Sequence, residues 1–175
     1  MSNIRVVPAA VVESLRRKAN KLKKQNGIPH HEALDAAARH GGVFTNWHQV
    51  IEAAKETEPS EHAFKKGLVI GLDPKEADGI GESEYFAYDN RVLMFVLEEL
   101  NAERRANGQR IEGEDYLDLV DDYSALVYLR CKNGVLADFD QATKLCAKEF
   151  FFPPRYIRFN GEVKDDWLRA DDECD

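Results

Sequence analysis

The sequence predicts an α+β protein: an N-terminal three-helix, helix-turn-helix-like module followed by a small α+β domain with a short antiparallel sheet. Three observations lead to this fold class. Helical periodicity fills residues 8–54, strand-like runs begin at residue 67, and the charge divides between the two regions. We therefore expect a basic module at 1–57, a linker at 58–66 and an acidic domain at 67–175.

The division of charge is the strongest compositional signal. Residues 1–66 carry eleven Lys and Arg against seven Asp and Glu, whereas residues 67–175 carry thirteen against twenty-five. The net charges are therefore +4 and −12. A basic region attracts phosphate and an acidic region repels it, so the two regions are expected to face different partners.

The remaining composition indicates an ordinary folded protein. No stretch resembles a signal peptide or an apolar segment long enough to span a bilayer, so we expect a cytoplasmic protein without a membrane partner. The three cysteines, Cys131, Cys146 and Cys174, are far apart and in no CxxC spacing. We expect the first two to be small core residues, and we expect no cofactor.

Apolar residues at three- and four-residue intervals predict a first helix over residues 8–27. Its inner face would consist of Val12, Leu15, Ala19 and Leu22. Gly27 is expected to end it as a left-handed C-terminal cap. The rest of its surface carries six cations, namely Arg16, Arg17, Lys18, Lys21, Lys23 and Lys24.

Two further helices are predicted in the first module. The second covers about residues 30–40 and ends at a double glycine. The hydroxyl of Thr45 is expected to cap a third helix that starts near Asn46. The segment 55–66 has no clear period and contains Pro59, so we place the module boundary there.

The elements of the second domain are predicted from apolar runs and turn residues. We expect a strand at 67–72, a glycine-rich acidic loop at 73–84, helices at 88–106 and 113–123, a hairpin about Asn133-Gly134, a helix from Asp138 to about Phe150, a last strand within 153–163 and a frayed end at 165–175. Asn-Gly favours a tight hairpin turn, and Asp138 is a good N-terminal cap.

The segment ALDAAARHGGVFTNWHQVIEAA, residues 33–54, follows the order helix, glycine turn, helix. In a helix-turn-helix the second helix enters the major groove, where Asn and Gln side chains pair with adenine edges. The predicted nucleic-acid interface consists of Arg16, Arg17, Lys21, Lys24, Asn46, His48 and Gln49. The alternative is a three-helix bundle without nucleic-acid contacts, which two glutamates on the same helix favour.

Acidic and aromatic residues form the second candidate site. Paired carboxylates can bind Mg²⁺ or act as acid and base, but those uses need companion residues in a cleft that the sequence does not indicate. A carboxylate-rich surface can instead bind a basic partner, and exposed rings within 149–159 would serve as a hot spot. The predicted partner-binding residues are Glu114, Asp115, Asp118, Asp121, Asp122, Phe151, Phe152 and Arg155. The histidines between residues 30 and 48 lack the spacing of a helical zinc site, so no metal is expected.

Eight positions within residues 11–51 follow a shared pattern, namely His31, Ala33, Leu34, Ala38, Gly42, Asn46, Trp47 and His48. On these positions the segment resembles a small N-terminal helical module of bacterial plasmid, phage and chromosomal proteins that is labelled glyoxalase-superfamily related. The resemblance implies a three-helix unit and a mobile-element context. It does not imply glyoxalase activity, because the metal-ligand set expected of that enzyme has no counterpart here.

The leading hypothesis is a non-catalytic binding or regulatory protein of a bacterial mobile element, similar to an antitoxin or a plasmid regulator. Its basic head would contact nucleic acid and its acidic body a protein partner. Two alternatives remain open. The body could imitate nucleic acid and inhibit a host defence nuclease, as an anti-CRISPR or anti-restriction protein does, or the chain could be a metal-dependent hydrolase that uses Asp115, Asp118 and Asp122.

Overall fold

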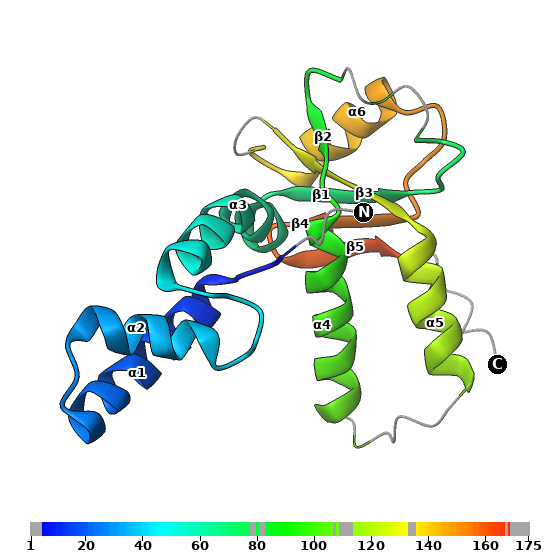
Figure 1. Cartoon of the computed structure of the whole chain (residues 1–175). Helices are drawn as coiled ribbons and strands as arrows, with labels where there is room; N and C mark the ends of the chain where they lie inside the picture. The colour runs from blue at the N-terminus through cyan, green and yellow to red at the C-terminus, as the bar shows by residue number, and fades with distance from the viewer. Residues whose placement is uncertain are drawn as a thin grey trace. The chain divides into compact units, whose positions relative to one another are not determined.

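The computed structural model describes residues 5–77, 80, 83–106, 108, 114–132, 136–166 and 168 (Figure 1). In this part of the chain six helices and five strands form two compact units, Met1–Pro59 and Ser60–Asp175. The first unit is helical, and the second combines helices with an antiparallel sheet. The predicted α+β fold class is confirmed.

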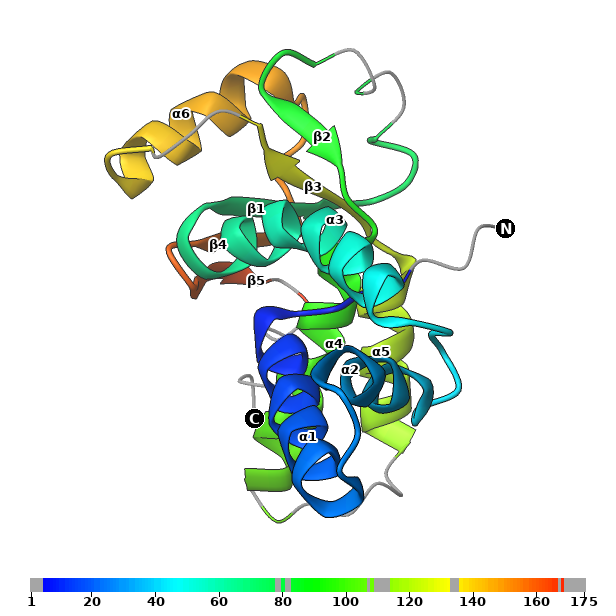
Figure 2. The same cartoon turned by 60° about the vertical axis from the view of Figure 1, so that its left-hand side comes forward.

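The first unit is built from helices α1 (Ala9–Asn26) and α2 (His30–Arg39) and the first part of α3 (Trp47–Lys66). Three alanines without solvent exposure, Ala19, Ala33 and Ala37, form one buried cluster. Small side chains allow a close approach of helix axes, and α1 and α2 lie side by side in Figure 2. A second cluster is formed by Val7, Val12, Ala38 and Val50.

Helix α3 continues through the segment predicted as a linker, and Pro59 lies inside it. Buried polar residues on both sides of the proline hold the helix. Thr57 Oγ1 accepts a hydrogen bond from Val7 N at 3.0 Å, and Ser60 Oγ donates to Asp89 Oδ2 at 2.7 Å. The expected interruption of the helix was wrong because these tertiary contacts compensate the backbone hydrogen bond that proline removes.

The second unit contains a five-stranded sheet in the order β2-β3-β1-β4-β5, with all neighbours antiparallel. The strands are β1 (Leu68–Leu72), β2 (Phe86–Tyr88), β3 (Val127–Cys131), β4 (Tyr156–Phe159) and β5 (Glu162–Asp166). Strand β1 is central and every residue in it is buried. Its apolar run without alternation is typical of a strand covered on both faces.

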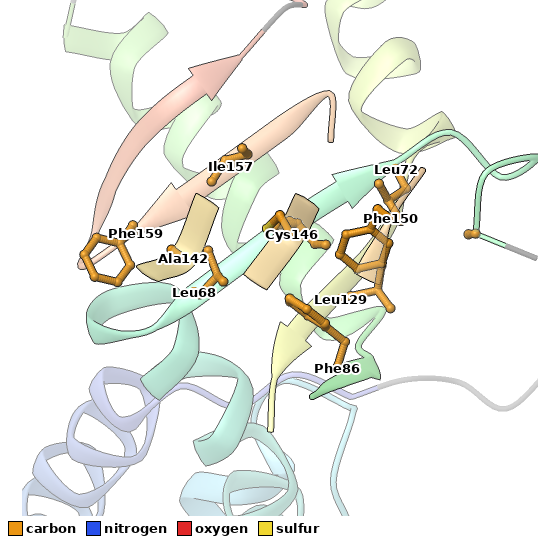
Figure 3. Packing of buried hydrophobic residues seen from close by; sticks show 11 residues of the cluster. Leu68, Leu72, Phe86, Leu129, Ala142, Cys146, Phe150, Ile157 and Phe159 are labelled. Atoms are coloured by element: carbon orange, nitrogen blue, oxygen red, sulfur yellow. The ribbon is translucent and has the colours of Figure 1, made fainter. Parts of the chain in front are cut away.

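Helix α6 (Phe139–Glu149) covers one face of this sheet, and α4 (Arg91–Ala106) and α5 (Glu114–Ala125) lie on the other (Figure 1). Alternate residues of β1 serve the two faces. On the α6 side, Leu68, Ile70 and Leu72 pack in a cluster with Ala142 and Cys146 (Figure 3). Cys131 is half-buried against the same cluster, so both cysteines belong to the core region, as expected.

The hairpin lies elsewhere than predicted. The turn at 133–134 is outside the described residues, and residues 136–138 form no strand, because β3 is already paired on both edges by β1 and β2. The hairpin joins β4 and β5 through Asn160 and Gly161, both at positive φ, 51° and 81°. This is the backbone that an Asn-Gly type I′ turn requires. The predicted last strand is therefore two strands.

The chain ends also differ from expectation. The segment 165–175 was expected to be frayed, but Asp165 and Asp166 belong to β5. Of the remaining residues, 167 and 169–175 lie outside the described part of the chain. Strand β2 was not predicted, and it follows the acidic loop directly. Its three residues are too few for a period in the sequence, and the strand exists through its pairing with β3.

Candidate functional site

The cations of α1 lie on its solvent side. Val12 and Ala19 are buried, whereas Arg16, Arg17, Lys21, Lys23 and Lys24 are exposed. Arg17, Lys21 and Lys24 stand at positions i, i+4 and i+7, which brings them onto one face of the helix. In the described part of the chain no ion pair engages these three side chains. We call Arg17, Lys21 and Lys24 the basic row.

Arg16 differs from the basic row because it already has partners. Its Nη1 lies 2.6 Å from Glu13 Oε1, with both side chains about half exposed. Its guanidinium also lies 6.0 Å from the centre of the Trp47 ring. Such exposed contacts are weak, so Arg16 remains available to an anion.

The start of α3 uses the residues that were predicted to contact bases. Asn46 Oδ1 accepts a hydrogen bond from Gln49 N at 3.0 Å, and Gln49 Oε1 accepts one from Thr45 N at 3.0 Å. Asp35 Oδ1 accepts from Trp47 N at 2.7 Å. These are reciprocal capping interactions at a helix N-terminus. Asn46 is therefore the cap, and the prediction that Thr45 has this role was wrong, because Asn46 directly precedes Trp47, the first residue of the helix.

His48 is exposed on the first turn of α3, but the next turn is acidic. Glu52 forms an ion pair with Lys55 at 3.0 Å. The hydrogen bond and the positive charge of Lys55 lower the pKa of Glu52, with a smaller contribution from His48. A carboxylate thus stays charged one turn after His48, where it would repel phosphate.

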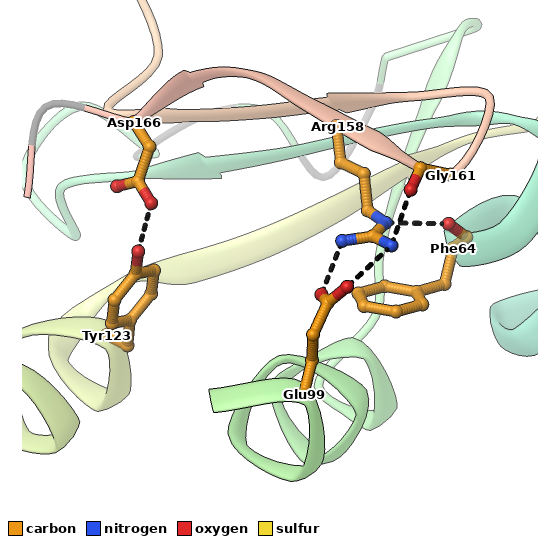
Figure 4. Close-up of polar contacts among 6 residues, drawn as sticks. All are labelled: Phe64, Glu99, Tyr123, Arg158, Gly161 and Asp166. Carbon is orange, nitrogen blue, oxygen red and sulfur yellow. Dashed lines mark hydrogen bonds and ion pairs between the residues drawn. The ribbon is translucent and has the colours of Figure 1, made fainter. Parts of the chain in front are cut away.

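The acidic residues of α5 face solvent. Asp118, Asp121 and Asp122 are exposed, and Leu117 among them is 58% exposed; the side chains of Glu114 and Asp115 lie outside the described residues. The opposite side of α5 is anchored by tyrosines. Tyr116 donates a hydrogen bond to Asn101. Figure 4 shows the second contact, in which Tyr123 donates to Asp166. The carboxylates therefore form a surface and not a cleft.

The loop between α6 and β4 presents two aromatic rings. Phe151 is 93% and Phe152 51% exposed, and their rings meet edge to face with centroids 4.8 Å apart. Both ends of the loop are fixed: Phe150 packs on Phe86 with centroids 5.0 Å apart, and Arg155 N donates to Gly71 O at 2.9 Å. We call Phe151 and Phe152 the aromatic pair.

The proline pair restrains this loop further. Pro154 is buried, and Phe152 precedes Pro153, which limits Phe152 to extended backbone conformations. Arg155 is nearly half exposed, and its guanidinium lies 4.0 Å from Asp73. The loop therefore holds an apolar pair beside a charged residue with little conformational freedom.

A buried polar network in the second unit was not predicted. Arg158 Nε donates to Phe64 O at 2.9 Å, its Nη2 to Gly161 O at 2.7 Å, and its guanidinium pairs with Glu99 at 2.5 Å (Figure 4). Arg158 is only 5% exposed. Burial opposes its charge, but the hydrogen bonds with Glu99 and Tyr156 and the charges of these groups raise the pKa of Arg158. No periodicity in the sequence points to this network, which joins α3, α4 and the β4–β5 turn.

Two of the three carboxylates named in the hydrolase hypothesis, Asp118 and Asp122, have described side chains. Within the described ranges no group of three His, Cys, Asp or Glu side chains could hold a metal ion. Asp118 and Asp122 are exposed to solvent, and the side chain of Asp115 lies outside the described residues.

None of the helices described is long and apolar enough to cross a membrane.

Comparison with known proteins adds no family to these observations. No family model, no curated protein and no solved structure matches the chain. The two candidate surfaces are therefore interpreted from their residues alone: the basic row in the first unit, and the α5 carboxylates with the aromatic pair in the second.

Proposed function

We propose that the chain is a non-catalytic, cytoplasmic binding protein of a bacterial mobile element, comparable to an antitoxin or plasmid regulator. The first unit contacts nucleic acid, and the second contacts a protein partner. The observation that carries the proposal is the basic row on α1, which is exposed and has no ion pair in the described part of the chain.

Electrostatics support the assignment of nucleic acid to the first unit. Binding to a polyphosphate releases its condensed counterions, and each Lys or Arg that meets a phosphate adds to this gain. Lys23 and Lys24 also lie in the last turn of α1, next to the negative end of the helix dipole, so a phosphate contact there relies on the side-chain charges. The second unit has a net charge of −11, which disfavours contact with phosphate.

Charge reversal tests the nucleic-acid contact. Arg17→Glu plus Lys21→Glu is expected to weaken binding to a short labelled duplex about tenfold or more at low salt, and to make the slope of log affinity against log salt shallower by about 2. The matched control is Lys75→Glu plus Lys144→Glu, which changes the net charge equally at exposed positions of the second unit. Fluorescence anisotropy measures both. Absence of binding by the wild type, or equal loss in the control, contradicts the proposal.

The aromatic pair supports a protein partner for the second unit. Aromatic residues on a restrained loop bury a large apolar area at low entropic cost, which is typical of an interface hot spot. The surrounding unit is acidic, so the complementary surface would be an apolar pocket with a basic rim.

Photo-crosslinking tests the protein contact. A photoreactive residue at position 151 is expected to yield one defined cross-linked protein in bacterial cells that carry the element, and the same residue at position 94 is expected to yield none. Met94 is the control because it is another exposed large hydrophobic residue of the second unit, 52% exposed. Equal or no cross-linking at the two positions contradicts the proposed contact.

The inhibitor hypothesis is supported by a different observation, the exposed carboxylates Asp118, Asp121 and Asp122 on one helix. Such a surface can occupy a basic nucleic-acid groove and bind in a salt-sensitive manner. Asp118→Lys plus Asp122→Lys is expected to release a bound nuclease, whereas Glu84→Lys plus Asp140→Lys retains it. Retention by both variants excludes mimicry through α5.

A further inference from the structure

The geometry points to a nucleic-acid contact that reads no sequence: α1 lies along the phosphate backbone of a duplex, and α3 supports it instead of acting as a recognition helix. This inference rests on the proposed nucleic-acid function of the first unit. It states which helix makes the contact, which form of nucleic acid is bound and what kind of selectivity follows.

The amide groups needed for base reading are already engaged at the start of α3. A bidentate pair with adenine uses both the oxygen and the nitrogen of an Asn or Gln side chain. Asn46 Oδ1 and Gln49 Oε1 each accept a backbone hydrogen bond at 3.0 Å. A base contact would have to share these oxygens or displace the two backbone amides, Gln49 N and Thr45 N, that hold the start of the helix. The two residues are therefore committed to the fold.

The rest of α3 does not suit a groove of DNA. Glu52 and Glu56 are exposed on its next turns, and the only lysine of its first three turns, Lys55, is paired with Glu52 at 3.0 Å. A recognition helix lies between two rows of phosphates, so charged carboxylates on it are repelled. The helix that presents cations to solvent is α1.

The basic row has the dimensions of a backbone contact. Arg17 and Lys24 are seven residues apart, which corresponds to about 10 Å along the axis at about 1.5 Å per residue. Each strand of a duplex carries one negative charge per about 3.4 Å of the duplex axis, so this length corresponds to about three phosphates of one strand. Lys and Arg on flexible stems contact phosphates without distinguishing the bases beneath them.

The aromatic residues of the first unit favour a duplex over a single strand. Single strands bind by stacking their bases on exposed rings. The rings of Phe44 and Trp47 are half-buried, and Arg5 and Arg16 lie over them at 5.3 and 6.0 Å. The large hydrophobic side chains exposed in the described part of this unit are aliphatic, Val11 and Val43. A stacking platform is therefore missing from the part of the unit that the structure describes.

A selection experiment tests the inference on the whole chain. Purified protein is equilibrated with a library of random duplexes, and bound molecules are sequenced. We expect no enriched motif, affinities for unrelated duplexes of one length within about threefold of each other, and weaker binding to the corresponding single strands. Enrichment of a motif, or tighter binding to single strands, overturns the inference. Absence of binding to any duplex overturns the proposed function itself, so the two failures are distinct.

Two variants separate α1 from α3. Asn46→Ser keeps an acceptor for the helix cap but removes the amide, and it is expected to leave affinity within about twofold of wild type. Lys21→Gln removes one cation of the basic row and is expected to weaken binding and reduce the salt slope by about 1. If Asn46→Ser weakens binding more than Lys21→Gln while circular dichroism shows an intact fold, α3 is the contacting helix and the inference is wrong.

Discussion

Arg158 was not singled out from the sequence, yet its buried guanidinium connects α3, α4 and the β4–β5 turn of the second unit. Its guanidinium donates to two backbone carbonyls and to Glu99, and it lies 3.9 Å from the centre of the Phe64 ring. A buried cation of this kind contributes little net stability compared with an apolar pair, but removal of one partner leaves the other uncompensated. Replacing only Arg158 or only Glu99 is therefore expected to lower the stability of the fold more than replacing both by apolar residues would suggest.

Arg158→Met is expected to lower the free energy of unfolding by about 3 kcal/mol, at the low end of the range for a broken buried pair because Glu99 is 35% exposed. Arg158→Met plus Glu99→Met is expected to lose less than the sum of the two single variants. Urea denaturation measures all three. Additive losses would mean that the pair does not act as a unit.

Tyr156 links residue chemistry to pH. Burial raises its pKa to about 12 from an ordinary value of 10.0, even though the nearby Arg158 favours the ionised form. The folded state therefore prefers the neutral phenol. This contribution to stability is complete below pH 10 and is lost as the pH rises through 12, by an amount on the order of 2 kcal/mol.

Tyr156→Phe is expected to reduce the loss of stability between pH 9 and pH 11.5, because the group that must ionise is absent. The buried Tyr156 hydroxyl interacts with the Arg158 guanidinium, so its loss is expected to change the free energy of unfolding at pH 7 by about 1 kcal/mol. Urea denaturation at several pH values measures this. A pH profile of Tyr156→Phe identical to that of the wild type would contradict the prediction.

At the scale of elements, helix ends were predicted correctly where residues at the helix end itself form the cap. Gly27 has φ of 63° and donates to Lys23 O, and Asp138 accepts from Gln141 N at 2.8 Å, both as predicted. Turn residues alone did not predict the position of the hairpin, because that position depends on which strands pair. Of the four Asn-Gly pairs, those at 133–134 and 160–161 both adjoin strand-like residues. The sequence alone does not show that the strands beside Asn160 are free to pair whereas β3 is occupied on both edges.

For the candidate surfaces, too, local sequence patterns predicted some features and tertiary contacts decided the others. Helical periodicity placed the cations of α1 correctly on the solvent side, because exposure there follows from the apolar stripe. It could not distinguish base reading from capping for Asn46 and Gln49, since one amide side chain serves both purposes. Phe151 and Phe152, which were predicted to bind a partner, are exposed and Phe150 is buried, but periodicity alone does not show how the loop is anchored.

Pro59 lies inside α3 and leaves one carbonyl of the preceding turn without its helical partner. Pro59→Ala is expected to raise the free energy of unfolding by about 1–3 kcal/mol, because alanine restores that hydrogen bond and removes the ring clash. Urea denaturation measures the change. Glu58→Ala, at the neighbouring exposed position, is the control with little expected effect. A less stable Pro59→Ala variant would show that the proline supports the boundary between the units.

At the scale of the whole molecule, the two units respond to salt for opposite reasons. The first unit, residues 1–59, has a net charge of +3 and binds phosphate in the proposed function. The second unit, residues 60–175, has a net charge of −11, so its carboxylates repel one another. The Debye length falls from about 30 Å at 0.01 M salt to about 10 Å at 0.1 M. Salt therefore screens an attraction at one surface and a repulsion within the other unit.

Added NaCl is thus expected to weaken duplex binding while it raises the melting temperature of the protein. Asp118→Asn, Asp121→Asn and Asp122→Asn in one chain remove three of the exposed charges of α5 and are expected to reduce the salt-induced rise in melting temperature, with no effect on the salt slope of binding. Anisotropy and calorimetry across one salt series measure both quantities. If salt changes binding and stability in the same direction, or if the α5 variant alters the binding slope, the two charges do not act as separate surfaces and the proposed division of roles between the units fails.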